Sequence, residues 1–404
     1  MKSEWTTRSI SDIAEINPRE SISKGSIAKK IPMDVLQPFT RDVPGYQMEK
    51  FKGGTRFRNM DTIMARITPC LENGKTAQVR CLDNGEVGFG STEYIVFRAK
   101  EGTDPDYLYY LICSPLVRDP AIKSMVGSSG RQRVQTDVVA NLQIAVPDFD
   151  EQKNIGGLLK ALDDKIQLNT AIKKNLEAQG LALYKSYFID FDPYEGTRPK
   201  GWNVVSLEDV CLKITDGSHY SPKDDSGAPY PMYSVKDMET YGFNSSSCKH
   251  ISADEFERMK KSDCVPLVND ILVAKDGSYL KEIFICSEQK DEAVLSSIAI
   301  FRPDPNVILP DILLFLLKQP SIRADVADNY VSGSALPRIV LKDFKKYQFI
   351  LPPIDEQRKI GNILHSFRMQ ITSNVNENNR LNALRDALLP KLMSGEIDVS
   401  DIDF

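Results

Sequence analysis

Apolar positions along the chain follow two different spacings. Short runs rich in β-branched and aromatic residues, bounded by Gly, Pro and Asn turns, are typical of strands. We predict such strands at 61–67, 94–98, 271–274, 283–286 and 298–301. An apolar helix is expected beside them near 106–113 and again near 311–318. These runs are interpreted as core structure.

Two longer stretches place apolar residues at mostly three- and four-residue steps, which predicts amphipathic helices. Asp148 and Glu151 form a capping pair before the first helix, and Pro352–Pro353 begins the second. Each helix is expected to run about 39 residues, or roughly 58 Å at ~1.5 Å per residue. Because a narrow apolar stripe on so long a helix needs another helix, we expect the two to pair with each other, antiparallel.

Polar residues interrupt both helical stripes. Asn169 and Asn374 fall at matching positions, and two interpretations stay open: either they meet and fix the register, or they face solvent. The exposed helix faces that a partner protein could contact are those near Gln167, Lys173, Asn378 and Arg385.

The same landmarks occur twice in the same order, about 205 residues apart. In the first copy they are Trp5 to Ile13, Asp61 to Arg66, Ser91 to Arg98, Tyr107 to Ile112 and Val146 to Gln152. In the second they are Trp202 to Val210, Asp270 to Lys275, Ser296 to Arg302, Ile312 to Leu317 and Leu351 to Gln357. Between landmarks the copies differ freely, as in 68–75 against 276–281. A shared frame with unlike loops is what two binding domains with different targets would show.

The repeat and the helices together predict an α+β fold: two pseudo-repeated mixed α/β domains separated by two long antiparallel paired helices. The expected segments are a domain at 1–147, a helix at 148–197, a second domain at 198–352 and a C-terminal helix at 353–404.

Composition fits an ordinary soluble protein, with 41% hydrophobic and 26% charged residues among 404. No apolar run approaches the ~18 residues of a membrane span, and the first residues do not form a signal peptide. The seven cysteines are scattered without a Cys-x-x-Cys, and the three histidines lack ligand spacing. We therefore expect no metal site, and reduced, mostly buried thiols in a cytoplasmic protein.

The net charge of −5 argues against a strongly basic nucleic-acid-binding protein. Residues 1–147 carry 20 Lys and Arg against 17 Asp and Glu, a charge of +3, whereas the other three segments are each negative. Any DNA binding must therefore use local clusters of cations and the help of a partner.

Each candidate catalytic motif lacks a residue that its chemistry requires. Gly74–Lys75–Thr76 resembles the end of a phosphate loop, but Pro69 stands where that motif needs glycine. Asp192–Pro193–Tyr194 lacks the second proline of the Asp–Pro–Pro–Tyr motif of amino-methylating enzymes and is better explained as a turn. We therefore predict no catalytic residues in this chain.

The alternation of a variable domain with a helix opened by Pro–x–x–Asp–Glu–Gln, twice, resembles the specificity (S) subunits of type I restriction–modification systems. The likeness covers essentially the full chain. Thr215–Asp216–Gly217–Ser218–His219 also looks like a recurring opening of the target-recognition domains of such subunits. The first copy departs from it, because Ile16–Asn17–Pro18–Arg19 stands there instead.

This resemblance implies a non-enzymatic DNA reader for phage defence. Each target-recognition domain would read one half of an asymmetric bipartite site in double-stranded DNA, and the helices would act as a ruler. Two modification (methyltransferase) subunits, which bind S-adenosylmethionine and methylate adenine N6, would grip the helices. Restriction/translocase subunits could join them. The chain itself would bind no cofactor.

Candidate DNA contacts are polar and cationic residues on loops. In the first domain they are Arg56, Arg58, Arg66, Asn73, Lys75, Ser128, Arg131 and Arg133. In the second domain they are His219, Tyr220, Lys236, Lys275, Ser278, Tyr279, Ser334 and Arg338. For each, the alternative is an ordinary solvated surface residue.

Two other functions stay open on the sequence alone. A stand-alone DNA-modifying enzyme would turn over substrate without a partner, and a protein-only coiled-coil scaffold would be indifferent to DNA sequence. The sequence also leaves open a complex that serves methylation only.

Overall fold

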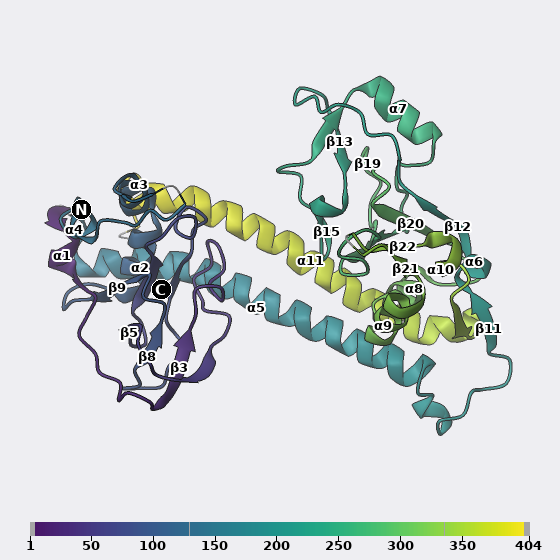
Figure 1. The fold of residues 1–404 in the computed structure, drawn as a ribbon, viewed down its shortest axis with the longest axis horizontal. Coiled ribbons are helices and arrows are strands. Elements are labelled where there is room, and N and C mark those ends of the chain that lie inside the picture. Colours follow the sequence, from purple (N-terminus) through teal and green to yellow (C-terminus); the bar gives the residue numbers. More distant parts are fainter. Residues whose placement is uncertain (1–4, 129, 335, 400–404) are drawn as a thin grey trace. The chain divides into compact units, whose positions relative to one another are not determined.

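The computed structural model describes residues 5–128, 130–334 and 336–399. The chain forms two compact units (Figure 1). Unit 1 comprises residues 1–168 and 377–404, and unit 2 comprises residues 169–376. Each unit contains one of the globular repeats and part of each long helix. The four predicted segments stay a prediction, since the units group residues by packing and not in chain order.

Both long helices are present, with nearly the predicted length. Helices α5 (Phe149–Phe188) and α11 (Ile354–Met393) contain 40 residues each. The predicted cap of the first is confirmed, because Asp148 Oδ1 accepts a hydrogen bond from the Glu151 amide at 2.9 Å. The second begins directly after Pro353, whose carbonyl oxygen accepts from the Gln357 amide at 3.1 Å.

Within unit 1, side chains of α5 and α11 contact each other through polar groups. Arg385 Nη1 lies 2.8 Å from Asp163 Oδ1, and Asn378 Nδ2 donates to the Ile166 carbonyl at 3.2 Å. The prediction that Asn378 and Arg385 form an exposed partner face is therefore wrong: they are only 6% and 9% exposed. The apolar stripe is narrow, so polar side chains at its edges are buried and paired.

The two matched asparagines lie in unit 2, and both are buried. Asn169 is 1% and Asn374 is 4% exposed, so the solvent-facing alternative is wrong. Asn374 Oδ1 accepts from Gln370 Nε2 at 2.9 Å on its own helix. Direct contact between the two asparagines stays a prediction.

The described residues of the globular part of unit 1 form three sheets. Its strands are β1 (Thr6–Ser9), β2 (Ala14–Ile16), β3 (Ile27–Ile31), β4 (Gln47–Lys50), β5 (Thr55–Phe57), β6 (Thr62–Ala65), β7 (Thr76–Gln78), β8 (Gly88–Gly90), β9 (Tyr94–Ala99) and β10 (Gln143–Val146). The main sheet is antiparallel with the order β2-β9-β6-β7. A second sheet has the order β4-β3-β8-β5, in which β3 and β8 are parallel. Strand β1 pairs with β10.

Unit 2 repeats this topology. Its strands are β11 (Asn203–Ser206), β12 (Cys211–Asp216), β13 (Tyr230–Tyr233), β14 (Met238–Glu239), β15 (Gly242–Phe243), β16 (Lys249–Ile251), β17 (Ile271–Ala274), β18 (Ile283–Ile285), β19 (Ala293–Val294), β20 (Ile298–Pro303), β21 (Val331–Ser332), β22 (Arg338–Ile339) and β23 (Gln348–Leu351). The order β12-β20-β17-β18 matches the main sheet of unit 1, and β11 pairs with β23 as β1 does with β10. The mixed sheet β16-β13-β19 again holds one parallel pair.

Short helices cover these sheets. Those of unit 1 are α1 (Ile10–Ile13), α2 (Pro105–Cys113), α3 (Pro115–Lys123) and α4 (Thr136–Ala140). Those of unit 2 are η1 (Asp192–Tyr194), α6 (Leu207–Val210), η2 (Val235–Asp237), α7 (Ala253–Lys261), α8 (Pro310–Leu317), α9 (Pro320–Asn329) and α10 (Leu341–Phe344). The two predicted apolar helices are confirmed as α2 and α8, and the predicted strands as β6, β9, β17, β18 and β20.

The main core of each unit lies between its antiparallel sheet, its apolar helix and a long helix. In unit 1, Phe97 and Tyr107 are fully buried together with Ile155 of α5. In unit 2, Phe301 and Ile312 are fully buried with Leu364 of α11. Among the described residues, no helix combines the length and the apolar character needed to cross a membrane.

Candidate nucleic-acid interface

The start of each long helix is bound to the start of its own repeat. Trp5 Nε1 donates to Glu151 Oε2 at 3.1 Å in unit 1, and Trp202 Nε1 donates to Glu356 Oε2 at 2.9 Å in unit 2. Because these residues are equivalent in the two copies, the glutamate of Pro–x–x–Asp–Glu–Gln has one structural role throughout. It fastens the first strand of the globular part to the helix.

The glutamine of the same motif holds the loop before the apolar helix. Gln357 Oε1 accepts from the Leu309 amide at 3.0 Å, and its Nε2 donates to the carbonyls of Val307 and Pro352. In unit 1, Gln152 binds three backbone groups in the same way: the amide of Asp104 and the carbonyls of Gly102 and Pro147. Both glutamines are buried, so these backbone groups depend on them.

A glycine one turn further along each helix lets this loop approach. A Cβ at Gly156 would lie 2.8 Å from the Tyr107 backbone nitrogen, and one at Gly361 would lie 2.4 Å from Leu309 Cδ1. In unit 1 the backbone of α2 therefore leaves no room for a side chain at this glycine, whereas in unit 2 the glycine is packed against the end of the Leu309 side chain.

A third shared contact joins neighbouring strands of the main sheet. Asp61 accepts two hydrogen bonds from Arg98, at 2.8 and 2.7 Å, and Asp270 accepts two from Arg302, at 2.9 and 2.8 Å. Both carboxylates are buried at the start of equivalent strands. Forked pairs of this kind fix direction as well as distance. We call these three sets of contacts, which recur at equivalent residues of the two units, the frame.

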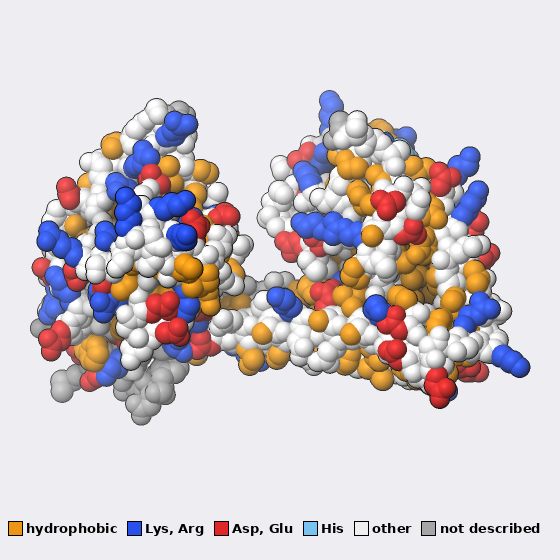
Figure 2. Space-filling model, turned by 60° about the horizontal axis from the view of Figure 1, so that its bottom comes forward, with side chains coloured by type: hydrophobic (Ala, Val, Ile, Leu, Met, Phe, Trp, Pro, Cys, Tyr) orange, Lys and Arg blue, Asp and Glu red, His pale blue; other side chains and the backbone are white. Residues whose placement is uncertain are grey.

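Beside this frame, unit 1 has a pocket of about 570 Å³ at the end of β2, which we call the unit 1 hollow. Its cations are Arg19, Arg56 and Arg66. Glu20 is its acid, but Arg58 and Arg98 bind that carboxylate at 2.6 and 2.7 Å. Burial raises the pKa of Glu20, but the hydrogen bonds with the two arginines outweigh this effect and hold that pKa below its usual value. Figure 2 shows Lys and Arg side chains gathered on the face of unit 1 that it presents.

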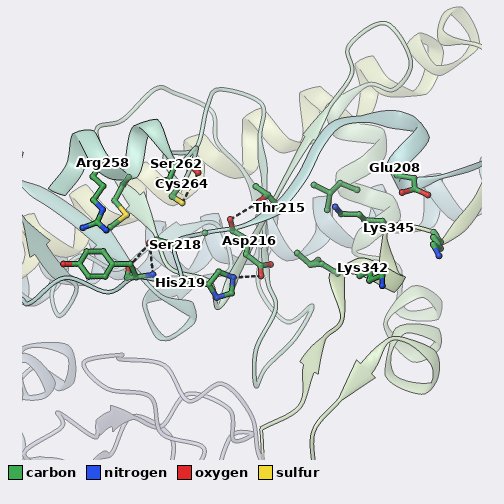
Figure 3. A pocket seen from close by; sticks show the side chains of 16 residues that line it. Glu208, Thr215, Asp216, Ser218, His219, Arg258, Ser262, Cys264, Lys342 and Lys345 are labelled. Carbon is green, nitrogen blue, oxygen red and sulfur yellow. Dashed lines mark hydrogen bonds and ion pairs between the residues drawn. The ribbon is translucent and has the colours of Figure 1, made fainter. Parts of the chain in front are cut away.

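Unit 2 has a pocket of about 770 Å³ at the end of the equivalent strand β12, which we call the unit 2 hollow (Figure 3). The loop 215–220 forms one part of its wall. Its remaining cations come from α7 and from the segment at and after α10: Arg258, Lys342, Lys345 and Lys346. Cys264 also lines it, and burial raises the pKa of that thiol, which disfavours the nucleophilic thiolate form.

A second candidate surface consists of two loops that run side by side in each unit, which we call the paired loops. In unit 1 they are residues 66–76 and 127–133, joined by the Val134 amide and the Arg66 carbonyl at 2.8 Å. In unit 2 they are residues 275–281 and 333–338, joined by the Ile339 amide and the Lys275 carbonyl at 3.0 Å. Residues 129 and 335, which fall within these ranges, lie outside the described residues.

The candidates of unit 1 divide between these two surfaces. Arg56 and Arg66 line the hollow, and the Arg58 guanidinium is bound to Glu20 at its edge. Four candidates, Asn73, Ser128, Arg131 and Arg133, are exposed on the paired loops. Lys75 is half-buried, and its Nζ donates to the Met33 carbonyl at 3.0 Å.

Intramolecular pairing changes what two of these arginines can offer to DNA. Arg133 forks onto Glu93 with distances from 2.7 to 3.1 Å, and these bonds hold the pKa of Glu93 below its usual value. Arg56 Nη1 is bound to the Glu20 carbonyl at 2.6 Å. Arg131, by contrast, is exposed, and no acid among the described residues binds its guanidinium.

In unit 2, His219 and Tyr220 line the hollow, whereas Ser278, Ser334 and Arg338 are exposed on the paired loops. Tyr279 of these loops is half-buried against the core. Lys236 is exposed in η2, outside both surfaces. Lys275 is only 6% exposed, and its Nζ lies 2.9 Å from Asp216 Oδ2, so its charge is used inside the protein.

Sequence reasoning missed several cations of the hollows. Arg19, Arg258, Lys342, Lys345 and Lys346 were not among the candidates, yet all five line a hollow. The one signal available was the closeness of three lysines within 342–346. Among the described residues, no group of three or more His, Cys, Asp or Glu side chains could hold a metal ion.

The sequence and the structure both have known relatives. The family profile described as "Type I restriction modification DNA specificity domain" matches residues 2–178 and again 199–383. The chain is 27% identical to the type I restriction enzyme MjaIX specificity subunit of Methanocaldococcus jannaschii, covering 75% of this chain and 71% of that protein. It is 25% identical to the HindI specificity subunit of Haemophilus influenzae, covering 88% and 89%.

A solved structure shares the fold across both units. The type I restriction–modification S subunit from M. genitalium aligns with a TM-score of 0.59 and 14% identity, covering 97% of this chain and 96% of that one. At that identity the likeness concerns the fold alone. The family profile covers most of the sequence in two copies, which coincide with the repeat. The chain therefore belongs to the type I restriction modification DNA specificity domain family.

Proposed function

We propose that the two globular parts read the two unlike halves of a bipartite DNA site. As a member of the DNA specificity family, the chain is the DNA-recognition component of a type I restriction–modification system and has no catalytic role. The observation that carries the finer proposal is the contrast within the repeat. The frame contacts recur at equivalent residues, whereas unlike side chains line the hollows and the paired loops.

The partners belong to the same proposal. Two modification subunits bind the paired, antiparallel helices α5 and α11, carry S-adenosylmethionine and methylate adenine N6. Restriction subunits join where the complex also cuts DNA, and the complex acts in the cytoplasm. The contacts of Arg385 with Asp163 and of Asn378 with the Ile166 carbonyl support the pairing of the helices. Helix length then sets the number of unread base pairs between the halves.

Methylation-aware sequencing tests this function. The chain and its genomic methyltransferase partner are expressed in a host without adenine methylation. We expect N6-methyladenine within one split motif whose halves differ. An uninterrupted motif, or two identical halves, would contradict the proposal. The purified chain alone, given S-adenosylmethionine and magnesium, should methylate nothing.

A further inference from the structure

Three lysines line the unit 2 hollow, where an acid, Glu208, also lies but forms no ion pair with them within the described part of the chain (Figure 3). Lys342, Lys345 and Lys346 line it, and within the described part of the chain none of them forms an ion pair. Their backbone is nevertheless well fixed. The Glu208 amide donates to the Lys345 carbonyl at 3.0 Å, and Phe344 is fully buried beside them. Charges held in place but not neutralised favour an anionic ligand.

The facing loop is rigid and adds no free negative charge. The Gly217 amide is bound to Ile298 at 3.0 Å and the Ser218 amide to Val294 at 2.8 Å, both through carbonyl oxygens. A Cβ at Gly217 would lie 2.3 Å from the Val294 carbonyl oxygen, so only glycine fits. The fixed backbone of Gly217 and Ser218 therefore sets the position of the next residue, His219.

That residue is His219, whose side chain is 77% exposed. Its Nε2 lies 3.3 Å from Asp216 Oδ2, the same oxygen that Lys275 Nζ contacts at 2.9 Å. Because Lys275 already balances Asp216, this carboxylate orients the imidazole without cancelling the three lysines. Figure 3 shows His219 and Asp216 turned toward each other between Arg258 and the lysine segment.

The unit 1 hollow shares the end of an equivalent strand and the sign of its charge with the unit 2 hollow. It lies at the end of β2, the equivalent of β12, but its arginines, Arg19, Arg56 and Arg66, come from other segments than the lysines of unit 2. If the two units read different base sequences, any feature they share must match something common to both half-sites. The sugar–phosphate backbone is that common feature.

We propose that the unit 2 hollow holds the phosphodiester backbone of the DNA half-site that this unit reads, and that Lys342, Lys345 and Lys346 neutralise its phosphates. Base reading then belongs to the paired loops. This inference rests on the proposed function and assigns a sequence-independent role to a defined site within it. Lysine suits that role, because a flexible point charge matches phosphate without selecting a base.

The test uses the assembled complex with its methyltransferase and its own DNA site. The variant Lys342→Gln/Lys345→Gln/Lys346→Gln is compared with Lys30→Gln/Lys213→Gln/Lys290→Gln. The control changes net charge equally, but its lysines lie outside the hollows, the paired loops and the long helices, and each is paired with a nearby acid. Each lost phosphate contact reduces the slope of log affinity against log salt by about 0.9. We expect the hollow variant to lose about 2 to 3 from that slope, and the control to lose much less.

The methylated motif is sequenced for both variants and should not change. A change at a base position would overturn the proposal, because the hollow would then read sequence. An unchanged slope would also overturn it, as would loss of the methyltransferase subunits on size-exclusion chromatography. Thermal unfolding and the single variant Lys342→Gln, expected to lose about 0.9, guard against misfolding. A wild-type complex that fails to select sequence would instead refute the proposed function.

Discussion

Unit 1 and unit 2 hold their long helices with the same contacts and line their hollows with different cations. In both, a glutamate binds a tryptophan, a glutamine clamps a loop and a glycine lets that loop approach. The hollow of unit 1 offers three arginines, whereas that of unit 2 offers three lysines, one arginine and one oriented histidine. Side chains that must build the fold are thus fixed, and side chains that face outward vary. The comparison separates structural from binding roles without reference to any other protein.

The largest expected effect concerns the glutamine clamp. Gln152→Ala and Gln357→Ala each remove the side-chain partner of one part-buried amide and two carbonyls, which should cost about 3 kcal/mol of unfolding free energy. Denaturant unfolding measures it. Gln167→Ala, at an exposed position of α5, is the control and should change stability by less than about 0.5 kcal/mol. A large loss of unfolding free energy for one variant and none for the other would show that the two frames are not equivalent.

The buried carboxylates of the main sheets should come next. Asp61→Asn and Asp270→Asn remove the charge that holds Arg98 and Arg302, at a cost of about 2 kcal/mol each. The cost stays below that of a fully buried pair because both arginines are partly exposed and have a second carboxylate. Thermal unfolding of the two variants should give similar shifts. Clearly unequal shifts would show that only one of these pairs belongs to the frame.

The paired loops sharpen the comparison at the level of specificity. Arg131→Ala should relax one base position in the half-site of unit 1, and Arg338→Ala one position in the half-site of unit 2, by about 1 to 3 kcal/mol each. The readout is the methylated motif of each variant, sequenced genome-wide. If either variant altered both halves, the assignment of one half-site to each unit would be wrong.

The smallest expected effect lies in the unit 1 hollow. Arg19 is exposed there, and Arg19→Gln should lower the salt slope of DNA binding by about 0.9 without changing the motif. Salt titration of the complex on its own site measures this. A relaxed base position would mean that the two hollows differ in role as well as in side chain.

Local patterns predicted the elements well. The run 271–274 is strand β17, and the Asp148–Glu151 cap stands at the start of α5, because strand and cap signals depend only on neighbouring residues. The roles of Gln152 and Gln357 could not be predicted, since the amides they bind lie 48 residues away in sequence. The same limit explains Arg385, whose partner Asp163 is 222 residues away.

The candidate site was predicted less completely than the fold. The paired loops of both units contain eleven of the candidates, because Gly, Ser and Arg in turns are a local signal. Lys275 was expected at the surface, but its partner Asp216 lies on another strand, and the pair is largely buried. The lysines of the unit 2 hollow were missed because folding, not sequence proximity, brings them to the loop 215–220.

The two helix-start contacts have a practical consequence. The chain contains only two tryptophans, and each is the hydrogen-bond donor of one of these joints. The tryptophan fluorescence of the chain therefore reports on these two helix-start contacts. Trp202 is packed among aromatic rings, whereas Trp5 is half-exposed, so their emission and their quenching by iodide should differ. Single Trp→Phe variants would then let an observer follow each joint separately when a methyltransferase or DNA is added.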